Sequence, residues 1–166
     1  MKIEVYTDGS CSINSLDSSK EGKGGFGYCI LKDNELVYEY YEMWDNTTNN
    51  RMEMRAIISA IDYCYNNYKD ADITIYSDSA YIVNCIKQKW YIKWMINGWR
   101  NSKREAVKNP DLWKLILHSH NGTVKEGKIK IEKVSGHSSI EWNEYADMLA
   151  NKWRTAINEN FSIDKK

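Results

Sequence analysis

Four acidic residues stand in four separate motifs, and folding would have to gather them before they could act jointly. They are Asp8 in VYTDGSCS, Glu53 in TTNNRMEM, Asp78 in IYSDSAY and Asp147 in GHSSIEWNEYADMLA. Carboxylate oxygens without sulfur or histidine ligands suit the hard cations Mg²⁺ and Mn²⁺. Two such ions held about 3.5–4 Å apart are a standard device for cleaving phosphodiester bonds. The four acids therefore predict a metal-dependent nuclease.

Each acid also has an ordinary structural interpretation when it is taken alone. Asp8 fits a turn, Glu53 a helix-dipole partner, Asp78 an N-cap and Asp147 a solvated helix position. The prediction of a shared site therefore depends on the motifs around the acids.

Composition restricts the class of protein. A chain of 166 residues with 42% hydrophobic content is long enough for one domain with a core. No run approaches the roughly 18 consecutive apolar residues of a membrane span, and MKIEVYTDGS lacks the features of a signal peptide. The four cysteines form no C-x-x-C pair, and the three histidines lack zinc-site spacing. We expect free thiols and a cytoplasmic protein.

Charge is balanced overall but not locally. The chain has 23 basic and 23 acidic residues, yet residues 87–108 contain seven basic residues and a single acid. The same segment holds Trp90, Trp94 and Trp99. A charge run alone is typical of a solvated helix face, whereas basic and aromatic residues together favour a nucleic-acid-binding element. Core packing is the competing interpretation for Trp94 and Trp99, and we prefer it for Trp94.

Hydrophobic periodicity and turn residues predict the elements that position these groups. Asn49 or Asn50 is expected to cap a helix that carries Glu53, and Asn109-Pro110-Asp111 predicts a second helix start. The expected strands are 2–8, 25–31, 36–41, 71–77 and 128–134, the last helix spans about 140–157, and 158–166 forms a frayed tail.

This element order predicts a mixed α/β fold in a single domain over residues 1–157. Three antiparallel N-terminal strands and two further strands would form a five-stranded mixed sheet flanked by helices. Asp8 would project from a strand, Asp78 from a strand end, and Glu53 and Asp147 from helices. Residues 87–108 would form a basic, Trp-rich handle.

The motifs resemble those of type 1 ribonucleases H of the bacterial single-domain kind. The resemblance covers roughly residues 2–155 and depends on whole sequence motifs rather than on isolated acids. The matching motifs are YTDGSCS, GKGGFGYCIL, TTNNRMEMRAI, SDSAYIV, the W-x3-W-x4-W pattern, VKNPDLW and VSGHSSIEWNEYADMLA.

The resemblance implies hydrolysis of the RNA strand of an RNA/DNA hybrid, leaving 3′-hydroxyl and 5′-phosphate ends. It implies that Asp8, Glu53, Asp78 and Asp147 hold two Mg²⁺ ions, which Mn²⁺ could replace. It further implies that His137, in the SGHSS loop, assists proton transfer or product release. An exposed loop histidine without a role is the alternative for His137.

The resemblance also implies the substrate contacts. Asn14, Asn49 and Asn50 would face the hybrid in its minor groove, where the 2′-hydroxyl marks RNA. Thr48 and Asn109 would hold a phosphate of the DNA strand, and Trp90 would pack against DNA sugars. No membrane contact or obligate protein partner is implied, and a monomer is the simplest expectation.

Three departures from the family pattern qualify these expectations. The loop INSLDSSKEGKGG is longer than usual, Ala80 stands where a polar residue is common, and the handle is only modestly basic. A catalytically weak or silent hybrid-binding module, or another metal-dependent nuclease of the same fold, is the alternative function. Retention of all four acids argues against the silent module.

Overall fold

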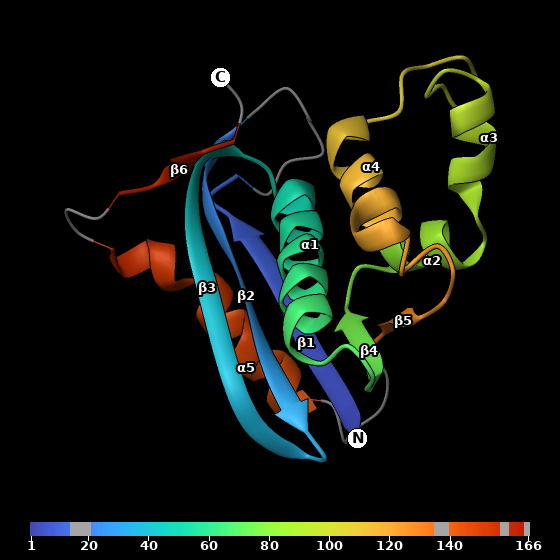
Figure 1. Cartoon of the computed structure of the whole chain (residues 1–166). Helices are drawn as coiled ribbons and strands as arrows, with labels where there is room; N and C mark the ends of the chain where they lie inside the picture. The colour runs from blue at the N-terminus through green and yellow to red at the C-terminus, as the bar shows by residue number, and fades with distance from the viewer. Residues whose placement is uncertain (14–20, 135–139, 157–159, 165–166) are drawn as a thin grey trace.

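The computed structural model describes residues 1–13, 21–134, 140–156 and 160–164. Over these residues, strands and helices alternate around one sheet (Figure 1). The strands are β1 Lys2–Cys11, β2 Gly22–Lys32, β3 Glu35–Thr47, β4 Asp72–Ser77, β5 Ile129–Lys133 and β6 Ser162–Ile163. The helices are α1 Asn49–Asn67, α2 Ala80–Lys87, α3 Trp90–Ile96, α4 Pro110–His118 and α5 Ile140–Ala150, with 3₁₀ turns η1 Ser119–Asn121 and η3 Lys152–Thr155.

The sheet has the strand order β5-β4-β1-β2-β3-β6. β1, β2 and β3 form an antiparallel meander, whereas β4 pairs parallel with β1 and β5 parallel with β4. The predicted mixed α/β fold is confirmed. The prediction of five strands is wrong by one, because β6 pairs parallel with the end of β3. A two-residue strand carries no periodic pattern that a sequence could reveal.

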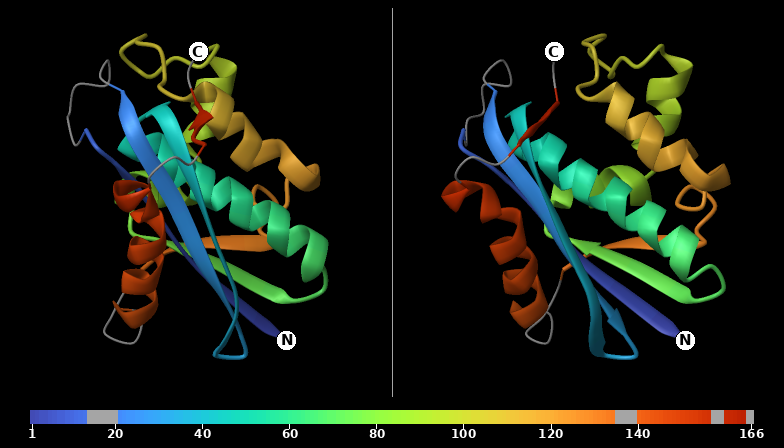
Figure 2. Two further views of the ribbon diagram at one scale, coloured as in Figure 1. Left: turned by 90° about the vertical axis from the view of Figure 1, so that its left-hand side faces the viewer. Right: turned by 60° about the vertical axis from the view of Figure 1, so that its left-hand side comes forward.

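The sheet separates two hydrophobic layers (Figure 2). Helix α1 lies on one face and α5 on the other. Ile57 and Ile61 of α1 are fully buried with Ile3 and Val5 of β1 in the larger core. On the opposite face, a β-carbon at Gly27 would stand 2.4 Å from Leu149 Cβ, so the glycine lets α5 approach the sheet closely. The two layers hold β1 in the centre of the molecule.

Local signals at the helix starts differ in detail from those expected. Thr48, rather than Asn49 or Asn50, is the N-cap of α1, and its side chain accepts a hydrogen bond from the Arg51 amide. Thr and Asn both cap helices well, so only the folded backbone decides among the three residues. Asn109 precedes α4 as expected, but its side chain makes no capping bond and has another partner.

The C-terminal segment is more ordered than expected. α5 ends at Ala150 and η3 follows, so the last helix is shorter than the predicted 140–157. The prediction of a frayed tail is wrong for residues 162–164, since β6 joins the sheet and the Asp164 side chain is completely buried. Buried ion pairs, described below, fix this segment.

The basic segment folds into α3 and the turns after it, beside α2 and α4 (Figure 1). Gly98, with φ +65°, lies just after the end of α3. The Trp94 ring meets that of Trp113 edge-on at 5.8 Å, and Trp94 packs against the main core. These contacts confirm core packing for Trp94. Within the described ranges no helix is long and apolar enough to cross a membrane.

Candidate active site

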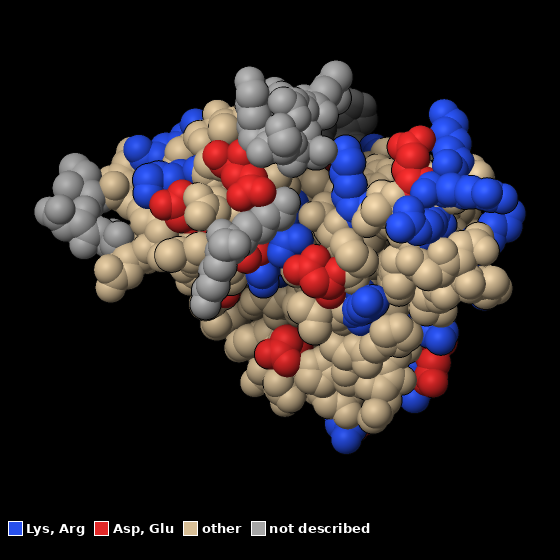
Figure 3. Space-filling model, turned by 90° about the horizontal axis from the view of Figure 1, so that it is seen from above, with Lys and Arg blue, Asp and Glu red and all other residues tan. Residues whose placement is uncertain are grey.

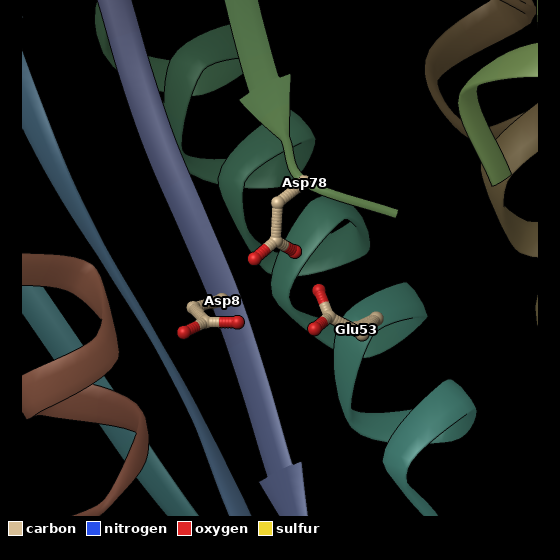
Figure 4. A group of neighbouring side chains, drawn as sticks. All are labelled: Asp8, Glu53 and Asp78. Atoms are coloured by element: carbon tan, nitrogen blue, oxygen red, sulfur yellow. The ribbon is translucent and has the colours of Figure 1, made fainter. Parts of the chain in front are cut away.

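Three of the four predicted acids meet at the centre of the sheet (Figure 4). One carboxylate oxygen from each of Asp8, Glu53 and Asp78 lies within 4.8 Å of the others. Figure 4 shows their carboxyl groups pointing toward one another from β1, α1 and the end of β4. The trio thus joins three elements that are far apart in sequence.

The fold fixes each member of the trio from a different rigid element. Asp8 lies on β1, the strand that pairs with both β2 and β4, and its Oδ1 accepts the Gly9 amide at 2.9 Å. Glu53 lies in the second turn of α1. Asp78 follows β4 directly, and the next residue, Ser79, caps α2 through the Ile82 amide at 3.3 Å. Acids held on strand and helix ends are placed more accurately than acids on free loops.

Burial and mutual repulsion raise the pKa values of the trio. Burial raises the pKa of Asp8 to about 7, and the nearby Asp78 charge adds to this. Burial and the charges of Asp8 and Asp78 raise the pKa of Glu53 well above its usual value. Burial also raises the pKa of Asp78. Carboxylates that repel one another in this way are stabilised by a cation.

One carboxylate oxygen of the trio lacks a hydrogen-bond partner. The Oε2 atom of Glu53 is buried and has no hydrogen-bond partner among the described residues. A buried unpartnered carboxylate oxygen is costly unless a cation or donor reaches it. Three carboxylates with no nitrogen or sulfur ligand match the preference of a hard divalent cation. The residues present therefore fit a divalent metal centre.

Asp147 lies at the rim of the trio. It projects from α5 and is exposed. Its negative charge contributes to raising the pKa of Asp78, and its interaction with Asp8 does the same for Asp8, so it stands beside both. The Asn151 side-chain amide donates to Asp147 Oδ1 at 3.3 Å, and Ser10 Oγ donates to Asn151 Oδ1 at 2.8 Å. These two hydrogen bonds connect the fourth acid, Asp147, to β1.

The predicted substrate residues are placed in two groups. Thr48, Asn49 and Asn50 form the start of α1, one turn before Glu53, and Asn109 lies at the start of α4. Trp90, at the start of α3, is 36% exposed and donates from Nε1 to Gln88. Two further predicted residues, Asn14 and His137, lie outside the described residues.

One group of basic side chains lies on the handle. In Figure 3, Lys and Arg side chains gather on the side of the molecule that carries α3. Arg100 and Arg104 line a cavity of about 520 Å³ there. Basic side chains gathered on one element and carboxylates on others suit the two electrostatic tasks of a nuclease, attraction of phosphates and binding of cations.

Two residues near the site were missed by sequence reasoning. Arg51, within the TTNNRMEM motif, is buried and forms ion pairs with Asp111 and Asp164. A helical arginine whose neighbours Met52 and Met54 are core residues was the available signal, because a buried guanidinium requires acceptors. Asp164, in the tail, gave no signal.

A family model described as RNase H matches residues 1–154. The chain belongs to the ribonuclease H family. The Ribonuclease H of Prosthecochloris aestuarii is 42% identical over 159 residues, which cover 96% of this chain and 97% of the relative. The Ribonuclease H of Syntrophomonas wolfei is 40% identical over 149 residues, or 90% and 93% of the two chains.

Solved structures agree with the family assignment. LC9-RNase H1, a type 1 RNase H with the type 2 active-site motif, has a TM-score of 0.67 at 27% identity and covers 89% of this chain and 69% of that one. A foamy viral protease-reverse transcriptase in complex with RNA/DNA hybrid has a TM-score of 0.75 at 21% identity, over 93% of this chain and 20% of that one, and shows the fold alone. Ribonucleases H are divalent-metal-dependent hydrolases of nucleic acids, so the predicted enzyme class is confirmed.

Proposed function

We propose that this ribonuclease H family member is an endonuclease that hydrolyses the RNA strand of RNA/DNA hybrids, leaving 3′-hydroxyl and 5′-phosphate ends. Two Mg²⁺ ions, replaceable by Mn²⁺, are its cofactors, and Asp8, Glu53, Asp78 and Asp147 are their ligands. The observation that carries the proposal is the convergence of three acids around an unpartnered buried oxygen of Glu53, within the fold of this family.

The chemistry divides between the cations and the protein. When bound, divalent cations supply a nucleophilic water at neutral pH and stabilise charge on the leaving oxygen. The protein's part is to hold the carboxylates in place before substrate arrives. Because the pKa of Asp8 is raised to about 7, protons leave this site as a cation binds.

Substrate choice is assigned to the residues around Glu53. Asn49 and Asn50 carry amides that can donate to and accept from a ribose 2′-hydroxyl, the group that distinguishes RNA from DNA. Thr48 and Asn109 lie at the starts of two helices, where backbone amides favour phosphate binding. Trp90 offers an exposed aromatic face to sugars of the DNA strand.

Two assignments come from the sequence motifs alone. Asn14 would contact the minor groove, and His137 would move a proton or help the product leave. Their tests are Asn14→Ala, which should raise KM, and His137→Ala, which should lower kcat.

Cleavage of three labelled duplexes tests the function. With Mg²⁺ present, RNA/DNA should be cut while RNA/RNA and DNA/DNA remain intact, and a chelator should abolish cutting. Asp78→Asn should also abolish it. Asp72→Asn is the matched control, because Asp72 begins the same strand and pairs only loosely with Lys130 at 3.6 Å. Comparable cutting of DNA/DNA, or full activity of Asp78→Asn, would refute the proposal.

A cytoplasmic monomer is the proposed state of the protein. All four cysteines are buried free thiols, which suits a reducing compartment. Light scattering after size exclusion should give the 19.5 kDa mass of one chain. A dimer mass at micromolar concentration would contradict the monomer.

A further inference from the structure

Asp164 binds the start of α1 from outside the segment that the family model matches, residues 1–154. Its backbone amide donates to the Asp45 carbonyl at 3.0 Å, continuing the pairing of β6 with β3. Its side chain has no exposed surface. A charged side chain is buried this completely only when it has strong partners.

The partners of Asp164 are three residues on or beside α1. Its carboxylate accepts from Thr47 Oγ1 at 2.7 Å, from Arg51 Nε and Nη2 at 2.9 and 2.8 Å, and from Arg55 Nη2 at 2.7 Å. Thr47 immediately precedes the N-cap residue Thr48. Charge-assisted bonds of this kind fix geometry as well as adding energy. The carboxylate thus holds the first turn of α1 from both sides of its cap.

Arg51 extends this network to α4. The Nη1 atom donates to Asp111 Oδ1 at 3.0 Å and to Asn109 Oδ1 at 3.1 Å, and Nη2 donates to Asp111 Oδ2 at 2.8 Å. Together with the two bonds to Asp164, all five N–H donors of the guanidinium are accounted for. The side chain is only 4% exposed. One buried group therefore joins α1, α4 and the 160–164 segment.

This geometry decides how the Asn109 amide is oriented. A guanidinium can only donate, so the Asn109 atom that faces it must be the oxygen. The Nδ2 donor of Asn109 is consequently turned away from Arg51. An amide with this orientation presents N–H groups, the part that a phosphate oxygen requires.

We propose that Asp164 is a positioning residue for substrate binding: by holding Arg51 it sets the Asn109 amide and the first turn of α1 for a DNA-strand phosphate. The inference rests on the proposed function, in which Thr48 and Asn109 contact that phosphate. Asp164 itself touches neither substrate nor cation. Its effect is expected on binding rather than on the chemical step.

Steady-state cleavage of an RNA/DNA hybrid tests the inference. Asp164→Asn should raise KM by about five- to tenfold, the effect of weakening one charge-assisted contact, and should leave kcat within about twofold. Asp164→Glu, which keeps the charge, should recover part of the loss. The control is Asp45→Asn, whose side chain pairs with Lys23 at 3.1 Å, so it removes a nearby negative charge without touching Arg51. Its KM should not change.

A double-mutant cycle separates positioning from general damage to the fold. Asp164→Asn combined with Asn109→Ala should raise KM by less than the product of the two single effects, because both changes act on the same phosphate contact. Asp164→Asn combined with Trp90→Ala should be additive, since Trp90 lies on α3. Additivity in both cycles would overturn the inference.

The remaining outcomes are also decisive. An unchanged KM for Asp164→Asn, with the wild type active, refutes the positioning role while the proposed function stands. A lowered KM refutes it too, because Asp164 would then compete with phosphate for the arginines. An inactive wild type instead refutes the proposed function. If circular dichroism shows that Asp164→Asn is unfolded, Asp164→Glu must itself raise KM, and an unchanged value again overturns the inference.

Discussion

Gly9 lies directly against the backbone of Glu53. A β-carbon added at residue 9 would stand 2.4 Å from the Glu53 amide nitrogen and 2.4 Å from the Met52 carbonyl carbon. Real β-carbons do not approach backbone this closely, and neither neighbour can move without moving α1. The glycine after Asp8 is therefore what allows β1 and α1 to bring their carboxylates together.

Gly9→Ala should separate these two elements and their acids. We expect hybrid cleavage to fall by about 10²-fold, since misplacement of catalytic groups by about 1 Å can cost that much. The free energy of unfolding should fall by about 1–3 kcal/mol, the usual cost of overpacking. Gly127→Ala is the control for activity: no atom lies within 4 Å of a β-carbon there, and its φ of +77° means that the substitution should cost stability without moving α1. Retained activity in Gly9→Ala would show that the close approach is not required.

The carboxylate trio predicts how stability changes with pH when no divalent cation is bound. The pKa of Asp8 is raised to about 7 in the folded protein, mainly by burial, so the folded state binds more protons than the unfolded state. Its contribution is favourable below about pH 4 and is lost as pH rises through about 7. Urea unfolding with a chelator should thus show lower stability at pH 8 than at pH 5.

Two changes should reverse that loss at pH 8. Asp8→Asn should raise the stability of the metal-free protein by about 1–3 kcal/mol, because it removes a charge that is unfavourable in this site. Mg²⁺ should stabilise the wild type but have a smaller effect on the variant. Equal stabilisation of both proteins by Mg²⁺ would place the cation elsewhere.

The network around Arg51 predicts the opposite pH dependence at the acid end. Hydrogen bonds from Arg51 lower the pKa of Asp111, and those from Arg51, Arg55 and Thr47 lower that of Asp164 against its burial. A lowered folded pKa contributes stability above the unfolded value of about 3.9, and this is lost as pH falls further. Acid unfolding should therefore begin below about pH 4.

Asp164→Asn should remove much of that acid dependence. At pH 7 we expect it to cost about 3 kcal/mol of unfolding free energy, the cost of leaving a buried guanidinium partly unpaired. The exposed ion pair of Lys130 and Asp72 gives the comparison, since Asp72→Asn should cost under about 1 kcal/mol. Similar losses in the two variants would show that burial of Asp164 adds little.

Two tryptophans of the handle should respond differently to truncation. Trp90→Ala should raise KM several-fold with little loss of stability, because its ring is 36% exposed. Trp94→Ala should instead lower the free energy of unfolding by about 2–4 kcal/mol, since its ring packs on Trp113. Hybrid binding and urea unfolding measure the two effects. The reverse pattern, in which Trp90→Ala loses stability and Trp94→Ala loses binding, would contradict both assignments.

Local patterns were sufficient to predict much of this molecule. The strand that carries Asp8, the helix that carries Glu53 and the strand that ends at Asp78 each have a periodicity or a terminal residue that marks them. The convergence of these three acids followed from motif resemblance and is seen directly in the structure.

What could not be predicted depends on contacts between distant segments. Arg51 donates to Asp164 across 113 residues, and the sequence around either residue does not predict that the two pair. The same reason hides β6, which exists only because β3 is already in place to pair with it. Thr48, rather than Asn49, is the N-cap of α1. The path of the chain between β3 and α1 determines which residue occupies that position.

The burial of every cysteine makes this protein suitable for site-specific labelling. Burial raises the pKa of Cys29, Cys64 and Cys85 to about 12. Cys11 is also buried, so reagents reach none of the four thiols easily, and they should react slowly with maleimides. A cysteine introduced at Ile96, which is 77% exposed on α3, would then be the preferred attachment point for a fluorophore. Docking of the handle onto a nucleic acid could be followed in real time on an otherwise unmodified enzyme.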